Sequence, residues 1–388
     1  MNDKLGFHRT SCVIVGGTNG IGAAFVEKLR KKYKKIYIFG RHDPIVSGKN
    51  IEFVKLDISK DSLDSFDEVI DDCDTLIITA GFGRVESFEK LDEPEINKLI
   101  STNFTSIVRL IKHSYKKISD SKDFYSMVVG SLAGELSSPL FSVYSASKAG
   151  LNRFVESINI ELEKSGTHNR ITNVMPISFS GTSFNGGKTD IKQLSELADF
   201  CLGAMYNRDT TFIPDYDNVC KGILDRYHSD PHGFGLSSYD YKINNNRINH
   251  EKQYKIGYLS GTFDLFHIGH LNLIRRAKEM CDYLIVGVHF DASHKGKETF
   301  IPFEERLAIV GANKYVDKVV MSEREDSDAW DKYHYDMLFV GSDYKGTERF
   351  KRYEEYFKDK GVEIVYFPYT KGTSSTQLRE ALSAIGKK

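Results

Sequence analysis

The sequence predicts an α/β protein with two doubly wound parallel sheets of the Rossmann type in tandem. Short β-branched runs alternate with helical patterns along both halves, which is typical of parallel sheets covered by helices. Glycine- or histidine-rich turns follow several strands, at the edge where such sheets bind ligands. A polar stretch without clear periodicity separates the halves. We therefore expect one domain at 10–228, a linker at 229–253 and a second domain at 254–388.

Composition narrows the function classes. The 388 residues are 40% hydrophobic and 28% charged, which fits two or three globular domains. The net charge of −1 offers no basic excess for nucleic acid or an anionic membrane, and no apolar run is long enough for a membrane span or a signal peptide. The cysteines occur singly, without a CxxC pair, as Cys12, Cys73, Cys201, Cys220 and Cys281. We therefore expect a cytoplasmic protein that acts on small molecules and has no disulfide framework or zinc site.

A glycine-rich turn in the N-terminal half indicates a dinucleotide site. A β-branched run at 12–15 precedes the turn, a helical pattern at 23–31 follows it, and a second strand is expected at 35–39. Glycines in such a turn let the backbone approach a pyrophosphate at the helix N-terminus. The residues expected to bind the cofactor here are Gly16, Thr18, Asn19, Gly20, Ile21 and Gly22.

The end of the second strand favours NADP(H) over NAD(H). This position has no acid to bind the ribose hydroxyls, and Arg41 can pair with a 2′-phosphate. Asp43 lies nearby and is interpreted as a turn residue. Further strands at 51–56, 75–79 and 127–129 end at the cofactor-binding candidates Asp57, Ala80 and Gly81, and at Ser131.

Two residues at helical spacing carry the chemistry of this half. Tyr144 and Lys148 are four positions apart in a helical pattern, so they share one helix face. An ammonium group beside a phenol favours the phenolate and makes the hydroxyl a usable acid or base. Ser131, at a strand end, can donate to a carbonyl oxygen. The set indicates reduction of a carbonyl group by a nicotinamide cofactor.

These motifs resemble the short-chain dehydrogenase/reductase family over about residues 10–228. The resemblance implies that Tyr144 is the acid/base, that Lys148 lowers its pKa and binds the nicotinamide ribose, and that Ser131 orients the carbonyl. It also implies that Asn103 supports a water in a proton relay. The chain departs from the family pattern in two places: Ile78-Thr79 stands where two asparagines are usual, and Ile177 follows Pro176 in place of glycine. The Gly/Ser/Thr-rich segment 178–192 is the expected substrate loop.

The C-terminal half contains a ten-residue signature at 261–270. It follows a strand expected at 255–259 and precedes a helical pattern at 271–280. His267 and His270 lie at the helix start, where backbone N–H groups and the helix dipole attract an anion. Such imidazoles can stabilise charge on a transferring phosphoryl group. Further strands are expected at 283–289, 318–321, 337–340 and 361–367, with a hydroxyl-rich turn at 372–376 as a second phosphate candidate.

The run GTFDLFHIGH resembles the HxGH cytidylyltransferases, and glycerol-3-phosphate cytidylyltransferases most of all. The resemblance implies that both histidines grip the CTP phosphates. It assigns nucleotide or acceptor contacts to Thr262, Phe263, Asp264, Lys295, Lys297, Arg306, Asp343, Thr373, Ser374, Ser375 and Thr376. Lys295 or Lys297 would neutralise phosphates, and Arg306 would hold the acceptor phosphate. The hydroxyl-rich turn at 372–376 resembles the second signature of this family. Tyr369 stands where that signature has an arginine that contacts the CTP phosphates, and Lys371 or Arg379 can take over this contact.

Together the halves predict a bifunctional enzyme. NADPH would reduce a keto-sugar phosphate, and CTP with Mg²⁺ would convert the alditol phosphate to a CDP-alditol for cell-surface polymers. Glycerol phosphate and a pentitol phosphate both stay open as acceptors. The alternatives are reduction after activation, ATP as the nucleotide, and a catalytically idle NADP(H)-binding domain that regulates the transferase. A homodimer or homotetramer is expected from both resemblances.

Overall fold

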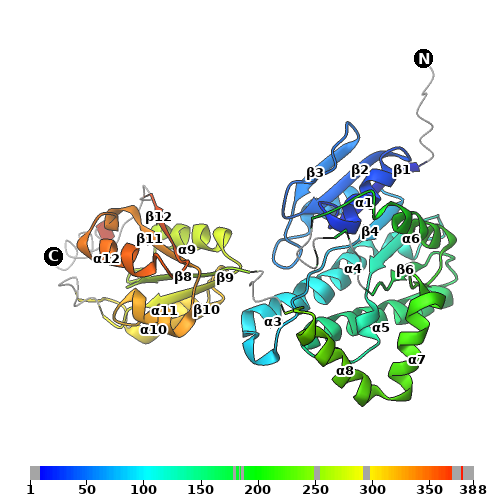
Figure 1. Ribbon diagram of the computed structural model, residues 1–388. Helices are drawn as coiled ribbons and strands as arrows, with labels where there is room; N and C mark the ends of the chain where they lie inside the picture. Colours follow the sequence, from blue (N-terminus) through cyan, green and yellow to red (C-terminus); the bar gives the residue numbers. More distant parts are fainter. Residues whose placement is uncertain are drawn as a thin grey trace. The chain divides into compact units, whose positions relative to one another are not determined.

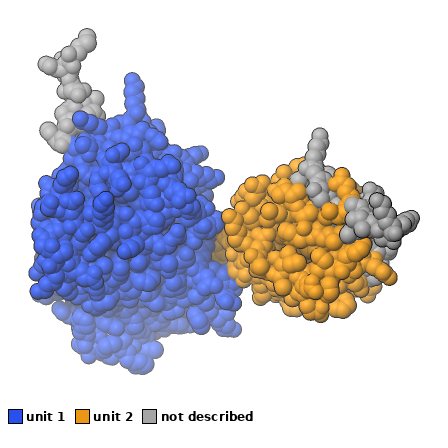
Figure 2. Space-filling view, turned by 180° about the vertical axis from the view of Figure 1, so that it is seen from behind, with its two compact units in different colours: residues 1–250 blue, residues 251–388 orange. Residues whose placement is uncertain are grey.

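The chain forms two compact units, residues 1–250 and 251–388 (Figure 2). The structure is a computed structural model that describes residues 9–177, 181–182, 184, 188–248, 254–291, 298–368 and 377–378. Each unit contains its own parallel sheet (Figure 1). The prediction of two doubly wound α/β domains is confirmed.

The first unit is organised around a seven-stranded sheet with the order β3-β2-β1-β4-β5-β6-β7. Every neighbouring pair is parallel. Its strands are β1 (Arg9–Val15), β2 (Tyr33–Gly40), β3 (Ile51–Lys55), β4 (Thr75–Ile78), β5 (Tyr125–Val129), β6 (Ile171–Val174) and β7 (Thr211–Phe212). The strand order reverses between β1 and β4, which is where a ligand crevice forms in a doubly wound sheet.

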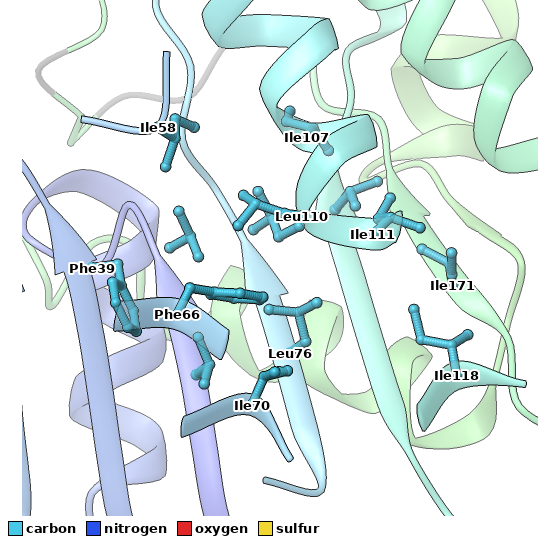
Figure 3. Close-up of a cluster of buried hydrophobic side chains, with 14 of the residues drawn as sticks. Phe39, Ile58, Phe66, Ile70, Leu76, Ile107, Leu110, Ile111, Ile118 and Ile171 are labelled. Atoms are coloured by element: carbon cyan, nitrogen blue, oxygen red, sulfur yellow. The ribbon is translucent and has the colours of Figure 1, made fainter. Parts of the chain in front are cut away.

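The helices of this unit are α1 (Gly20–Leu29), α2 (Asp64–Ile70), α3 (Glu93–Ile100), α4 (Ser106–Ile118), α5 (Ser142–Ser165), α6 (Ser195–Asn207), α7 (Lys221–Ser229) and α8 (Pro231–Asn244). Five of them, α1, α2, α4, α5 and α6, pack on the two faces of the sheet. On one face Phe66 of α2 and Leu110 of α4 pack with Leu76 of β4, and α5 joins the same cluster (Figure 3). On the other face α1 and α6 pack together through residues such as Phe25 and Leu202.

The second unit repeats this plan with five parallel strands in the order β10-β9-β8-β11-β12. The strands are β8 (Ile256–Gly261), β9 (Tyr283–Val288), β10 (Lys318–Met321), β11 (Met337–Gly341) and β12 (Glu363–Phe367). The helices are α9 (Ile268–Met280), α10 (Phe303–Gly311), α11 (Asp326–Tyr333) and α12 (Glu348–Phe357). One core lies on the α9 and α10 face and the other on the α11 and α12 face.

The expected linker is helical over most of its length, so that interpretation of 229–253 is wrong there. Helix α8 begins after Asp230, whose side chain accepts a hydrogen bond from the Gly233 N–H at 2.9 Å, and Pro231 occupies its first turn. A capping aspartate followed by proline is a strong helix start. The helix was missed because its apolar and polar residues are mixed around its axis.

Two further expectations can be compared with the fold. All five cysteines are free and buried, in agreement with the prediction of no disulfide framework. Within the part of the chain that the structure describes, we find no helix that is both long and apolar enough to cross a bilayer.

Candidate active sites

The glycine-rich turn between β1 and α1 has the tight geometry that a dinucleotide site requires. Gly16 has a φ of 93°, which favours glycine. A Cβ on Gly22 would lie 2.3 Å from the Gly16 carbonyl oxygen, so α1 begins against the turn with no room for a side chain. The Asn19 side chain does not cap α1, and the first N–H group of the helix, that of Gly20, donates to the Thr189 hydroxyl at 2.9 Å.

The threonine that departs from the family pattern has a definite structural role. The Thr79 hydroxyl donates to the Gly16 carbonyl oxygen at 3.0 Å, and the Ala80 N–H donates to Val15 at 3.2 Å. These bonds tie the end of β4 to the glycine turn. The missing asparagine is therefore compensated at this contact, and Ala80 and Gly81 lie next to the predicted cofactor turn.

Arg41 and Asp57, which are expected to bind the adenosine part of the cofactor, follow the carboxyl ends of β2 and β3. Arg41 is exposed beyond β2, whereas Thr18 is buried and packs against Gly40. Asp57 accepts from the Ser59 N–H at 3.0 Å and the Ser59 hydroxyl at 2.6 Å. Its carboxylate therefore orders the loop after β3, and the position of Arg41 is compatible with a phosphate contact.

The four predicted catalytic residues of this unit are brought together at the carboxyl edge of the sheet. Ser131, Lys148 and Asn103 are all buried. A Cβ on Gly81 would lie 3.2 Å from Asn103 Oδ1 and 3.4 Å from Lys148 Nζ, so these groups converge on the Gly81 backbone. Tyr144 lies one turn before Lys148 on α5 and is also buried.

The electrostatics of the pair differ from the expectation that Lys148 lowers the pKa of Tyr144. Burial raises the pKa of Tyr144 to about 12, and the Ser131 hydrogen bond only partly opposes this shift. Burial also lowers the pKa of Lys148 to about 8. The physical reason is that Lys148 Nζ donates to the Val129 carbonyl oxygen at 2.8 Å and lies 5.9 Å from the Tyr144 ring centroid.

Asn103 sits in a π-helical turn, Ser101–Thr105, between α3 and α4. Its Oδ1 accepts from the Phe82 N–H at 3.0 Å, and its Nδ2 donates to the Phe82 carbonyl oxygen at 2.8 Å and to the Ser147 hydroxyl at 3.2 Å. Single π-helical turns are frequent at functional sites. The turn aims the amide at the segment after β4 and at α5.

Aromatic side chains form a wall beside Tyr144. The Phe141 ring is stacked on Tyr144, with ring centroids 4.1 Å apart, and Phe184 packs edge-on at 5.5 Å. A Cβ on Gly83 would lie 2.7 Å from both stacked rings, so the segment after β4 closes the other side. Phe184 belongs to the expected substrate loop, of which residues 178–180, 183 and 185–187 lie outside the described residues.

An amide network that the sequence did not predict lies next to Ser131. Asn152 donates to the Ser131 carbonyl oxygen at 3.1 Å and to Glu135 Oε1 at 2.8 Å, and it accepts from Asn173 Nδ2 at 3.0 Å. The network holds the catalytic serine against α5 and β6. Asn152 follows Lys148 by four residues, so a third polar residue on the buried face of α5 was the available signal.

The two histidines of the second unit lie side by side at the start of α9. Their ring centroids are 4.0 Å apart. His267 Nδ1 accepts from the Gly269 N–H at 3.0 Å, and His270 Nδ1 accepts from the His267 N–H at 3.4 Å. These acceptor roles assign the proton of each neutral ring to Nε2. His267 therefore carries an Nε2–H donor of the kind that binds a phosphate, and burial lowers its pKa.

The turn before the histidines is held in an unusual backbone conformation. Phe263 and Leu265 have φ values of 53° and 49°, which side-chain-bearing residues seldom adopt. Phe263 is buried in the core and touches the His270 ring. Thr262 Oγ1 is buried and finds no hydrogen-bond partner among the described residues. The strained backbone and the unpartnered hydroxyl therefore lie in the same turn, directly before the two histidines.

Arg306 does not present its guanidinium to a phosphate in this structure, which corrects the expectation that it holds the acceptor. It is fully buried and donates to the carbonyl oxygens of Ile301, Thr262, His289 and Phe290 at 2.9, 2.6, 2.8 and 2.7 Å. It therefore joins the signature turn to the segment after β9. The sequence pattern identified an arginine at the right place but not the four acceptors.

Asp264 has a similar structural role. Its carboxylate is buried and accepts from the N–H groups of Phe300 and Ile301 at 3.0 to 3.2 Å. Asp343 is exposed just beyond β11, at the ligand edge of the sheet. The remaining expected nucleotide contacts, Lys295, Lys297 and Thr373–Thr376, lie outside the described residues, as do Tyr369, Lys371 and Arg379.

The two compact units match two different families of known proteins. The short chain dehydrogenase family model matches residues 10–191, and the cytidylyltransferase-like model matches 258–381. Glycerol-3-phosphate cytidylyltransferase of Bacillus subtilis is 35% identical over 130 residues, which is 32% of this chain and 95% of that protein. The Staphylococcus aureus enzyme is 34% identical over 126 residues, 31% of this chain and 90% of its own length. A solved short chain dehydrogenase from Burkholderia cenocepacia, in complex with NADP, is 20% identical with a TM-score of 0.50, covers 59% of this chain and 97% of its own, and shows the fold of the first unit.

Proposed function

Because the C-terminal half belongs to the cytidylyltransferases and the N-terminal half to the short-chain dehydrogenases, we propose that this bifunctional enzyme makes a CDP-alditol. The first unit reduces a keto-sugar phosphate with NADPH. The second transfers a cytidylyl group from CTP to the resulting alditol phosphate and releases pyrophosphate. One observation carries the proposal: a single chain holds both a Ser131–Tyr144–Lys148 site and an HxGH site.

The residues of the first unit fit NADP(H). The turn brings the backbone at Gly16 and Gly22 too close for a side chain at either position and leads into the N-terminus of α1, which suits a pyrophosphate. Arg41, which is exposed after β2, is proposed to pair with a 2′-phosphate. The bound nicotinamide supplies the hydride. Ser131 donates to the carbonyl oxygen of the substrate and Tyr144 delivers its hydroxyl proton to that oxygen, while Lys148 binds the nicotinamide ribose.

The residues of the second unit fit a nucleoside triphosphate. His267 offers an Nε2–H donor, His270 stacks on it, and the buried Thr262 hydroxyl lies in the same turn. A phosphate oxygen of the acceptor attacks the α-phosphorus of CTP, and the histidines stabilise the charge that develops as the bond to pyrophosphate breaks. Mg²⁺ would arrive with CTP, and Lys295 and Lys297 are proposed to neutralise the phosphates.

The nature of the acceptor follows from the relatives of each half. Similarity to glycerol-3-phosphate cytidylyltransferases favours a polyol phosphate, and a fused reductase favours one made from a ketose phosphate. Glycerol phosphate and a pentitol phosphate are the two candidates. We further propose a cytosolic enzyme that supplies cell-surface polymer synthesis, with a homodimer or homotetramer as the expected assembly, which light scattering would check.

Product analysis by mass spectrometry tests this proposal. The full chain receives CTP, Mg²⁺ and a panel of triose and pentulose phosphates, with and without NADPH, and Tyr144→Phe serves as the matched control. A CDP-alditol that forms only with NADPH and only with Tyr144 intact is the expected product. CTP consumption that yields a CDP-ketose would place reduction after activation. If Tyr144→Phe retains full turnover, the assigned chemistry of the first unit is wrong.

A further inference from the structure

Lys242 of helix α8 is hydrogen-bonded to the segment that precedes Phe141, the ring stacked on Tyr144. The inward face of α8 is made of small or polar side chains, with Gly235 and Ser238 against the segment that precedes α5. Lys242 Nζ donates to the Pro139 carbonyl oxygen at 2.6 Å, to the Ser138 hydroxyl at 2.9 Å and to the Ser238 hydroxyl at 3.3 Å. These three hydrogen bonds tie α8 to the 138–139 segment, while Phe234 of α8 packs on Tyr227 of α7.

The segment 138–140, to which Lys242 is hydrogen-bonded, contains a strained residue and lies just before Phe141 and Tyr144 in the chain. Leu140, next to Pro139, has a φ of 62°, a conformation that costs free energy for a side-chain-bearing residue. Its carbonyl oxygen accepts from the Glu86 N–H at 2.8 Å. A strained residue keeps its conformation only where its surroundings hold it. Here the Glu86 backbone holds it on one side and Lys242 on the other.

Phe141 follows Leu140 and transmits this position to Tyr144. Its ring is stacked on Tyr144 with an interplanar angle of 19°, and Gly83 leaves both rings no space to shift away. A movement of the 138–140 segment therefore moves the ring that covers one side of the acid/base. The position of the Phe141 ring therefore shapes the surroundings of the Tyr144 hydroxyl.

We infer that Lys242 is a positioning residue of the reductase, which holds Phe141 over Tyr144 and thereby sets the fit of the carbonyl substrate. This inference rests on the proposed reductase activity. Lys242 and α8 lie beyond residues 10–191, where the dehydrogenase family model matches, so the brace is built from the extension that follows that region. Burial lowers the pKa of Lys242 to about 8, in keeping with an ammonium group that is half-buried between these acceptors.

Steady-state kinetics of NADPH oxidation test the inference in the full chain, with the ketose phosphate that proves active in the product analysis. Lys242→Met removes all three hydrogen bonds, Lys242→Arg keeps donors at the same place, and Lys221→Met on the exposed start of α7 is the matched control. We expect Lys242→Met to raise KM for the ketose phosphate about tenfold with kcat changed less than about threefold, and Lys242→Arg to restore most of the loss. NADPH affinity and cytidylyl transfer should stay unchanged.

Amide hydrogen exchange of residues 136–142 provides a readout that needs no substrate. Exchange in this segment should rise in Lys242→Met and stay at the wild-type rate in Lys221→Met. A wild-type KM or unchanged exchange in Lys242→Met would overturn the inference, as would an equal loss of NADPH binding in both Lys242 variants, which indicates a general fold defect. If the wild-type chain oxidises no NADPH with any ketose phosphate, the proposed function is refuted instead. Amide hydrogen exchange of residues 136–142 then tests by itself whether Lys242 holds this segment.

Discussion

Substitution of Gly22 by alanine should weaken the reductase unit, although alanine is the better helix former. A Cβ at this position would lie 2.3 Å from the Gly16 carbonyl oxygen, 2.6 Å from Thr79 Oγ1 and 2.9 Å from the Gly16 carbonyl carbon. Two of these atoms are backbone, so relief requires the glycine turn itself to shift. Overpacking of this kind costs about 1–3 kcal/mol.

Gly203 in α6 is the matched control, because it is also a helix glycine but a Cβ there meets no atom within 4 Å. Gly203→Ala should stabilise the unit by about 0.5–1 kcal/mol through helix propensity alone. At about 2–4 °C per kcal/mol for a unit of this size, Gly22→Ala should lower Tm by about 2–12 °C, whereas Gly203→Ala raises it by a few degrees.

Differential scanning fluorimetry of the full chain, with and without NADPH, measures both variants. The displaced Gly16 turn should also weaken NADPH binding in Gly22→Ala and leave it intact in Gly203→Ala. If Gly22→Ala melts at or above the temperature of Gly203→Ala and binds NADPH normally, the close approach of α1 to the turn does not exist as described.

Three other substitutions give sharp outcomes. Burial lowers the pKa of Lys148 from 10.5 to about 8 on folding. Between these two pH values the unfolded chain binds more protons than the folded chain, so the contribution of Lys148 to the stability of the wild-type protein rises with pH. Lys148→Met should therefore raise Tm most below pH 8 and lose this advantage towards pH 10.5; a constant difference in a pH series of melts would argue against a buried ammonium. His267→Asn keeps an N-cap for α9 but removes the imidazole, so cytidylyl transfer should fall about 100-fold or more while Tm changes by less than about 2 °C and NADPH oxidation is unaffected. A large fall in Tm would mean that His267 serves mainly as a cap. Arg306→Ala leaves four carbonyl oxygens without their donor and should destabilise the second unit by about 3 kcal/mol or more in urea melts; unchanged stability with weakened substrate binding would restore the phosphate-holding role.

The sequence predicted those features that depend on local patterns. Strand-turn-helix order and the i, i+4 spacing of Tyr144 and Lys148 depend on neighbouring residues, so both sheets and the shared helix face of this pair could be predicted. The role of Arg306 could not, because its acceptors come from segments at Thr262, His289–Phe290 and Ile301 that only the fold brings together.

Two other differences have different causes. Helix α8 lacks a periodic pattern, and only Asp230-Pro231 signalled its start. The pKa of Tyr144 depends on how far burial outweighs the neighbouring ammonium, which is a property of packing and not of spacing. Sequence spacing placed the pair on one helix face but gave no measure of its desolvation.

Among the residues that the structure describes, the first sheet contains only strands β1 to β7 and the second only β8 to β12. During synthesis the ribosome therefore finishes every strand of the first sheet before it begins the second. Parallel sheets fold slowly because their pairings are distant in sequence, and a chain divided in this way limits each search to its own segment. A nascent chain that stalls after residue 250 already contains all the strands of its first sheet, which lowers the risk that unpaired strands from the two halves pair with each other and aggregate.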